Sequence, residues 1–358
     1  MGRRTMLWVL AGIGAVLLVL PAAASAKGVT KVVYAGPPPF TRAIAKAILP
    51  KSFAPTYNPD APQFFNERTT INVGGTVSFL INGFHSVDFP GSAKTDLPLI
   101  IPSGGLISGQ NDFAGNPFWF NGKALTLGFN PALFGPSGGH VYSGTKRVES
   151  GVAPKKPFNV TFTKPGVYKF FCDVHPGMVG YVVVKPKGKP VPTAAQDQAR
   201  PVKTVTKDIK AAKKLPKTKI PADTVDLGLA GLGGVELYAM VPSTLTVNAG
   251  TVVTFQIPKG VREVHTATFG PQSYLTPLQK AFQAGPTFPG AATYPSDATM
   301  PIDLTPTSHG NGFASTGALD QDPTTPLPSS GQIDFTTPGT YTYQCLIHPF
   351  MHGTIIVK

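Results

Sequence analysis

The sequence contains little cysteine and little charge. Only two of its 358 residues are cysteine, and charged residues make up 14% of the chain, against about 25% in an average domain. So few cysteines argue against a disulfide-rich scaffold, and so little charge argues against helical bundles and coiled coils. Glycine (39) and proline (38) are frequent instead, and 42% of the chain is hydrophobic. This composition predicts an all-β fold of short strands joined by turns, with residues 42–48 and 206–215 as candidate helices.

Long apolar runs are also missing, except at the N-terminus. Arg3 and Arg4 precede an apolar run at residues 6–20, and small residues follow at 24–26. This pattern predicts a signal peptide over residues 1–26, cleaved after Ala26. The run is shorter than the about 20 residues that a membrane span needs, and a retained anchor is the alternative. We therefore expect an exported protein, in the periplasm, the cell envelope or outside the cell.

The net charge of +13 is concentrated in one segment, because residues 185–219 hold eleven Lys/Arg and two acids. The segment has almost no aromatic residues, so we expect no nucleic-acid binding. We predict a solvated linker over residues 187–221, between domains at 27–186 and 222–358 that need not touch. An interaction of this basic linker with an anionic membrane or cell-wall surface, or with an acidic redox partner, is the alternative.

The two predicted domains contain the same unit. Residues 159–185 and 332–358 align without a gap and share twelve identical positions, and residues 71–79 resemble 247–255. A histidine follows each upstream segment, and a Cys-x2-His-x2-Met motif lies in each downstream one. Equivalent cysteines belong in separate folds, so a disulfide between Cys172 and Cys345, the alternative, is disfavoured.

Each half therefore offers one thiolate, two imidazoles and one thioether. Such a set is the ligand arrangement of a blue copper site, because sulfur favours Cu(I), imidazole suits Cu(II), and a weak axial thioether completes the site. A lone Cys or Met would more often be a disulfide half or core packing, and Cys-x2-His alone could be half of a zinc site. Two complete sets predict two coppers per chain, held by His85, Cys172, His175 and Met178, and by His265, Cys345, His348 and Met351.

Both halves resemble the cupredoxins, the blue-copper family of plastocyanin, amicyanin and pseudoazurin. Residues 345–353 (CLIHPFMHG) are similar to the amicyanin ligand loop, and residues 172–180 (CDVHPGMVG) are the same loop with Gly in place of Phe. The resemblance covers the two ends of each domain well and its middle poorly. It implies two tandem Greek-key β-sandwiches, each with copper near one end.

The resemblance also implies roles for single residues. His175 and His348 would reach the surface as the ligands through which electrons pass. Pro176, Pro349 and Phe350 would form part of an apolar docking patch. Ser86 and Thr266, which follow the first histidines, would steady the ligand loops.

Both halves are longer than a small cupredoxin. The first histidine and the cysteine lie 87 and 80 residues apart, so each domain carries a long loop insert. His140 and His309 lie in these inserts, where a surface or structural role is favoured over metal binding. The inserts could cover the barrel, pack the domains together or shape a partner site.

The combination predicts an exported electron-transfer protein, not an enzyme, that shuttles single electrons between a redox donor and an acceptor. A two-domain copper oxidase or nitrite-reductase-like enzyme is one alternative. It would need further copper ligands, but the chain has no His-x-His pair, and only His140, His309 and His352 remain. A copper storage or delivery protein is the other alternative, for which six methionines are few.

Overall fold

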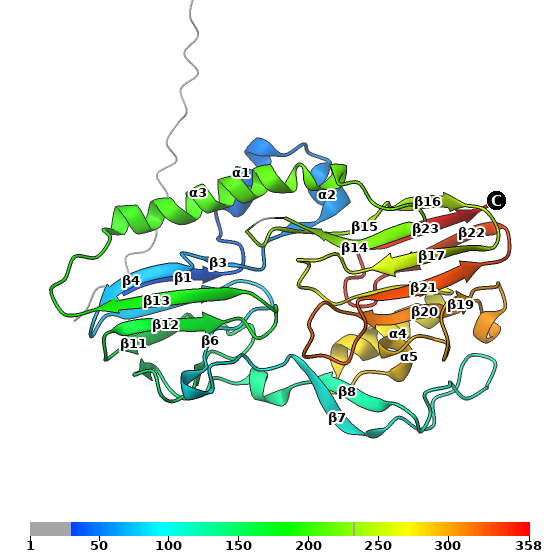
Figure 1. Cartoon of the computed structure of the whole chain (residues 1–358), viewed down its shortest axis with the longest axis horizontal. Coiled ribbons are helices and arrows are strands. Elements are labelled where there is room, and N and C mark those ends of the chain that lie inside the picture. The colour runs from blue at the N-terminus through cyan, green and yellow to red at the C-terminus, as the bar shows by residue number, and fades with distance from the viewer. Residues whose placement is uncertain (1–29, 232) are drawn as a thin grey trace, which may run out of the picture.

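The computed structural model describes residues 30–231 and 233–358. The predicted signal peptide, residues 1–26, lies outside this part of the chain. Two β-rich bodies lie side by side, joined by helices along one edge and by a hairpin along the other (Figure 1). No helix within the described ranges has the length and apolar character of a membrane span. The predicted β-rich fold class is confirmed.

The first body consists of two five-stranded sheets around one core. Its strands alternate inward and outward residues; in β5, for example, Val77 and Phe79 are fully buried. Phe89 and Phe170 pack against Phe79 from the facing sheet. One sheet has the order β3 (Phe64–Phe65), β1 (Thr30–Ala35), β5 (Thr76–Ile81), β11 (Phe158–Phe162), β9 (Val141–Tyr142). The other has the order β10 (Val148–Glu149), β6 (Asp88–Phe89), β12 (Gly166–Phe171), β13 (Val179–Lys185), β4 (Arg68–Asn72).

The second body repeats this plan with one addition. Its six-stranded sheet has the order β19 (Ile302–Asp303), β21 (Ser330–Phe335), β17 (Thr251–Gln256), β14 (Thr224–Ala230), β15 (Glu236–Val241), β2 (Pro59–Asp60). The facing sheet has the order β16 (Thr244–Val247), β23 (His352–Val357), β22 (Gly339–Gln344), β18 (His265–Phe269), β20 (Ala314–Leu319). The added strand, β2, comes from the first half of the chain and pairs antiparallel with β15.

The repeated glycine after each Met ligand has a packing reason. A Cβ at Gly180 would clash with the ring of Phe170 on the neighbouring strand β12. Gly353 stands in the same relation to Tyr343 on β22. In both bodies an aromatic ring therefore occupies the space that a side chain at this glycine would need.

The segment predicted as a solvated linker, residues 187–221, is in large part a helix with a buried face. The segment contains α3 (Ala194–Ala212) and a short turn, η3 (Leu215–Lys217), and Thr193 caps α3 in a capping box with Gln196. The candidate helix at 206–215 overlaps the C-terminal part of α3, which ends at Ala212. Val205 and Ile209 are buried against Phe65 of the first body. The basic segment folds because apolar residues at helical spacing lie among its lysines.

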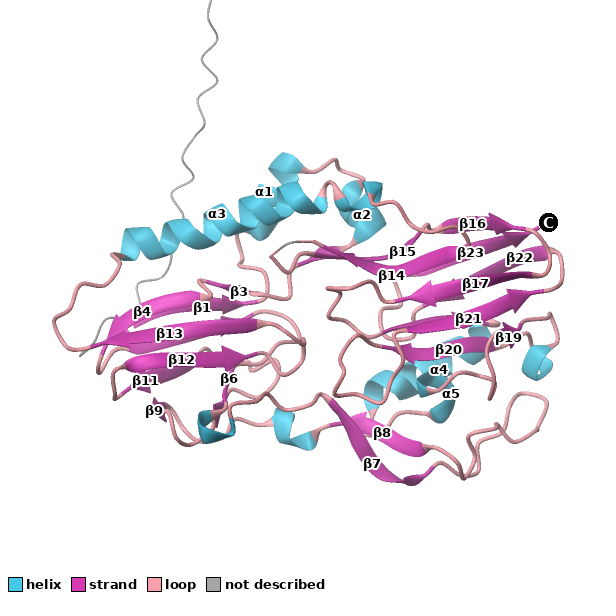
Figure 2. Cartoon of the chain, in the orientation of Figure 1, coloured by secondary structure: helices cyan, strands magenta, loops and turns pink. Residues whose placement is uncertain are grey.

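The helix α3 also covers both bodies, as Figure 2 shows. Beside it lie α1 (Thr41–Ile48), at the position expected from the sequence, and α2 (Phe53–Tyr57). Ala212 near its C-terminus packs with Leu229 and Leu237 of the second body. The basic segment therefore forms a helix that packs against both bodies. The two bodies also contact each other, which the sequence did not require.

The inserts join the bodies on the opposite edge. The first insert forms a hairpin of β7 (Ile100–Leu106) and β8 (Leu125–Phe129), with short turns η1 (Gly91–Ala93) and η2 (Pro131–Phe134). The second forms α4 (Gln272–Ala284), α5 (Gly290–Thr293) and η4 (Ser308–Gly310). Leu127 of the hairpin is buried with Phe282 and Phe288 of the second insert. Of the roles left open by the sequence, the inserts perform the packing of the domains.

Candidate metal centres

The first candidate centre lies at the end of the first sandwich. His85 comes from the loop between β5 and β6, Cys172 directly follows β12, and His175 lies in the loop before β13. Cys172 Sγ lies 3.4 Å from His175 Nδ1 and 3.8 Å from His85 Nδ1. All three residues are buried, and one ligand atom from each lies within 4.8 Å of the others. The structure thus brings together side chains that are 87 residues apart in the sequence.

The second centre repeats this geometry. Cys345 Sγ lies 3.8 Å from His265 Nδ1 and 4.0 Å from His348 Nδ1, and the two Nδ1 atoms are 3.1 Å apart. Both cysteines are free, so the disulfide alternative is wrong. These two groups are the His/Cys/Asp/Glu clusters of metal-binding geometry found within residues 30–231 and 233–358.

The spacing of the Cys-x2-His-x2-Met motif closes each ligand loop. The Cys172 N–H donates to the Met178 carbonyl at 3.0 Å, and the Met178 N–H donates to the His175 carbonyl at 3.0 Å. The corresponding bonds of Cys345, His348 and Met351 are 3.1 and 2.8 Å. Both methionines are buried at the cores' ends. The backbone itself therefore fixes where the loop turns back toward the cysteine.

The residues after the first histidines hold the ligand loops, as the resemblance implied. Ser86 Oγ accepts from the Asp173 N–H at 2.9 Å and donates to the Asp173 carboxylate at 3.0 Å. Thr266 Oγ1 accepts from the Leu346 N–H at 2.9 Å. In each centre the hydroxyl thus ties the residue after the cysteine to the strand region of the first histidine.

The electrostatics of both centres favour thiolate. Burial alone would raise the pKa of the Cys172 thiol, but the facing His175 and His85 hold it well below its usual range. The same opposition, with His265 and His348, lowers the pKa of Cys345. The thiolate is the form that ligates metals. A soft thiolate with two imidazole nitrogens fits copper, and the donor set of each group therefore suits that metal.

Two glycines make room for the first histidines, and sequence reasoning missed both. Gly36, which follows β1 with φ +78°, would place a Cβ 2.5 Å from His85 Nε2. Gly228 in β14, with φ +88°, would place a Cβ 3.3 Å from His265 Nε2. The first follows β1 and the second lies in β14, the equivalent strand, so an alignment of these two segments was the signal that could have found them.

The expected surface position of His175 is wrong. The residue is 3% exposed, and its Nε2 lies 2.6 Å from Glu263 Oε1 of the second body. The other oxygen of Glu263 lies 3.7 Å from His348 Nε2. Burial would raise the pKa of Glu263, but His175, followed by His348 and His265, holds it well below its usual range, so the group is a carboxylate.

Sequence reasoning also missed Glu263 and Tyr238. The Tyr238 hydroxyl donates to Glu263 Oε1 at 3.0 Å, and its ring centroid lies 5.1 Å from that of His348. Glu263 stands two residues before a ligand histidine, whereas the first half has Gly83 at that place. The acid therefore has no counterpart in the repeat, and only the contact between the bodies gives it a role.

The second centre borders an open groove. A groove of about 690 Å³ is lined by Tyr238, His348 and Phe350 together with residues of α1, α2 and α3. The side chain of His348 is 16% exposed, and Phe350, at 49% exposed, stacks on Tyr238 with 6.4 Å between ring centroids. Phe350 of the expected docking patch is therefore exposed beside the second centre.

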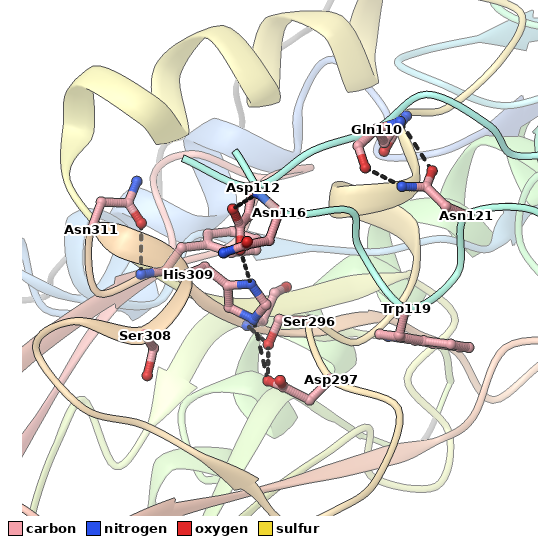
Figure 3. A network of polar contacts seen from close by, with 12 residues as sticks. Gln110, Asp112, Asn116, Trp119, Asn121, Ser296, Asp297, Ser308, His309 and Asn311 are labelled. Carbon is pink, nitrogen blue, oxygen red and sulfur yellow. Dashed lines mark hydrogen bonds and ion pairs between the residues drawn. The ribbon is translucent and has the colours of Figure 1, made fainter. Parts of the chain in front are cut away.

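The insert histidines lie outside both centres. His309 Nδ1 lies 3.3 Å from Asp112 of the first insert, and its Nε2 lies 3.4 Å from Asp297 of the second (Figure 3). Its ring also stacks on Phe118, and its pKa is raised, first by the hydrogen bond to Asp297. His140 is exposed and contacts the Asn159 carbonyl. The favoured structural and surface roles fit these positions.

Comparison with known proteins gives one family match. Residues 140–185 match the family described as copper binding proteins, plastocyanin/azurin family. Solved structures similar to the chain include an oxidised amicyanin variant (18% identity, 40% of this chain and 87% of that chain, TM-score 0.22). A purple cupredoxin from Nitrosopumilus maritimus is similar at 16% identity over 38% of this chain and 100% of that chain, with a TM-score of 0.20. A comparison with curated proteins found no match.

Proposed function

We propose, on the premise that this chain is a cupredoxin-like protein of the plastocyanin/azurin copper-binding kind, that it carries one type 1 blue copper in each half and transfers single electrons. The observation that carries the proposal is the duplicated His–Cys–His group, closed by the same loop in both bodies. Copper bound there would supply the one-electron chemistry. The chain's own residues hold the metal, exclude water from it and fix the ligand geometry in advance.

The rigid supports of the ligands favour electron transfer over storage. Backbone bonds within each loop and the hydroxyls of Ser86 and Thr266 fix the loops that carry the donors, and outer contacts of this kind orient metal ligands and tune the metal. The enzyme alternative would need a further copper site. His309 is engaged by two carboxylates and His140 lies on the surface, so their positions lend that alternative no support.

The donor, the acceptor and the location are further parts of the proposal. Residues 1–26 have the pattern of a signal peptide, and we place the protein outside the cytoplasm on that ground. The helix α3, which lines the groove beside His348 with Val205 and Ile209, also carries exposed lysines, among them Lys207 and Lys210. This charge favours an anionic partner, either an acidic redox protein or a membrane or cell-wall surface.

The test is a quantitative paramagnetic resonance spectrum of the copper-loaded protein with total copper counted. We expect two coppers per chain, both with the narrow hyperfine splitting of thiolate-bound Cu(II). Cys172→Ala and Cys345→Ala should each remove one signal and leave the other. An additional wide-splitting signal would support the enzyme alternative, and the absence of a thiolate-type signal would overturn the proposal.

A further inference from the structure

We infer that Glu263 bridges the two copper centres and carries electrons between them. The second centre accepts electrons from an external donor, and the first receives them through Glu263; we call this path the relay. The inference rests on the proposed function, because it needs redox copper in both halves. Glu263 lies on the second body, outside both ligand sets, and contacts a ligand histidine of each centre.

The bridge consists of one side chain. Glu263 Oε1 accepts from His175 Nε2 at 2.6 Å, and Oε2 lies 3.7 Å from His348 Nε2. In each histidine the other ring nitrogen, Nδ1, faces the cysteine sulfur. Each imidazole therefore presents one nitrogen to a metal position and the other to the same carboxylate. Electron tunnelling falls steeply across empty space, and this arrangement replaces the space with one short hydrogen bond and one close contact.

The surroundings hold the bridge in place. The Tyr238 hydroxyl donates to Glu263 Oε1 at 3.0 Å. The neighbouring Arg262 is fixed on both sides: its backbone N–H donates to Glu236 at 2.9 Å, and its guanidinium donates to the Pro62 carbonyl of the first half. Strand β2 pairs with β15 in the same region. A group locked by such contacts keeps its geometry during transfer, which is the condition for fast exchange.

The two centres differ in their access to solvent, and this difference gives the relay a direction of entry. His175 is 3% exposed, and its outer nitrogen faces Glu263. His348, with 16% of its side chain exposed, borders the 690 Å³ groove, and a smaller cavity of about 370 Å³ between the centres is lined by His85, His175, Glu263 and His348. An external donor therefore reduces the second centre first. One electron then passes from Cu(I) of the second centre to Cu(II) of the first, which leaves Cu(II) and Cu(I) respectively; no bond forms or breaks.

The experiment follows bleaching of the thiolate-to-copper absorption when the fully oxidised full-length protein is mixed with hexaammineruthenium(II). In the unmodified protein both centres should bleach in one fast phase. In Glu263→Leu about half of the amplitude, that of the first centre, should become slower by about 10- to 100-fold, the usual cost of losing an outer-shell partner. Glu263→Gln, whose amide oxygen can still accept from His175, should restore most of the fast phase.

Two single-centre variants identify the phases. Cys345→Ala leaves only the first centre, which should bleach at the slow rate because the second centre no longer accepts electrons from the donor. Cys172→Ala leaves only the second, whose fast bleaching should be the same with and without Glu263→Leu. The Cu(II)–Cu(II) distance from pulsed paramagnetic resonance, a readout independent of electron transfer, should match in the unmodified protein and in Glu263→Leu.

The outcomes separate the inference from its premise. Absence of the thiolate absorption before mixing refutes the proposed function itself. Wild-type kinetics in Glu263→Leu, or fast bleaching of the first centre in Cys345→Ala, overturns the relay while leaving both coppers in place. If Glu263→Leu lengthens the metal–metal distance, Glu263→Gln decides, because it keeps the side chain's size and an acceptor oxygen for His175: a restored fast phase supports the bridge, and a slow phase at the unmodified distance overturns it.

Discussion

Removing the Ser86 hydroxyl tests how the first ligand loop is held. Ser86 is fully buried, and its Oγ makes two bonds to Asp173, one from the backbone N–H at 2.9 Å and one to the carboxylate at 3.0 Å. Asp173 also accepts from the Leu97 N–H at 2.9 Å. Ser86→Ala would therefore loosen the residue next to Cys172 and, with it, the start of the first insert.

The expected cost follows from these contacts. An orphaned buried N–H costs about 1–3 kcal/mol, and a hydrogen bond to a carboxylate contributes about 1.5–3 kcal/mol. The two overlap, since both end on Asp173, so we expect Ser86→Ala to lower the unfolding free energy by about 2–4 kcal/mol. In Thr266→Ala one amide, that of Leu346, loses its acceptor, and the expected loss is about 1–3 kcal/mol.

The assay is urea unfolding of the metal-free full-length protein, paired with copper affinity by competition. Thr266→Ser, which keeps the hydroxyl and loses one methyl, is the matched control and should cost about 1 kcal/mol. Copper affinity should fall about 10- to 100-fold at the altered centre in both alanine variants. A change within about 0.5 kcal/mol for Ser86→Ala, the range of an ordinary surface substitution, would refute this account of the loop.

Two further predictions concern pH. The pKa of His309 is raised, first by its hydrogen bond to Asp297. The protonated residue therefore stabilises the fold fully below about pH 6.5, and this stabilisation is lost as the pH rises through the pKa of His309 in the folded protein. His309→Ala should therefore lower the urea midpoint more at about pH 5.5 than at about pH 8.5, while His140→Ala, at an exposed position, should leave the midpoint unchanged at both pH values. Equal effects of His309→Ala at both pH values would contradict a stabilising contact of His309 with Asp112 and Asp297. Burial raises the pKa of Glu236 to about 8. The contribution of the neutral side chain to folding stability is therefore complete below about pH 4.5 and is lost as the pH rises through about 8. Glu236→Gln should remove up to about 1.4 kcal/mol per pH unit of that decline, and parallel stability curves for the two proteins would show the reasoning to be wrong.

The ligand groups could be predicted because their information is local and repeated. Cys172 and His175 are three residues apart, and the second copy of the motif separates them from chance matches. The distant His85 was found through the repeat as well, since His265 follows an equivalent strand. The sandwiches followed from the same alternation of apolar and polar residues that the buried faces of β5 and β17 show.

The contact between the halves could not be predicted in this way. Glu263 contacts His175 of the other body, and neither its position in the sequence nor the repeat predicts that contact. The helix α3 was concealed by lysines, although Pro201, Val205, Ile209 and Ala212 recur at helical spacing on its buried face. Strand β2 has two residues, too few for any periodicity.

The exchange of segments between the halves limits how such a chain can be divided. Pro59–Asp60 completes a sheet that otherwise belongs to residues 224–335, and Leu127 fills a core made by Phe282 and Phe288. A gene fragment encoding residues 222–358 alone would leave the edge of β15 bare and the underside of α4 uncovered. The second half therefore depends on segments of the first for a complete sheet and a covered core.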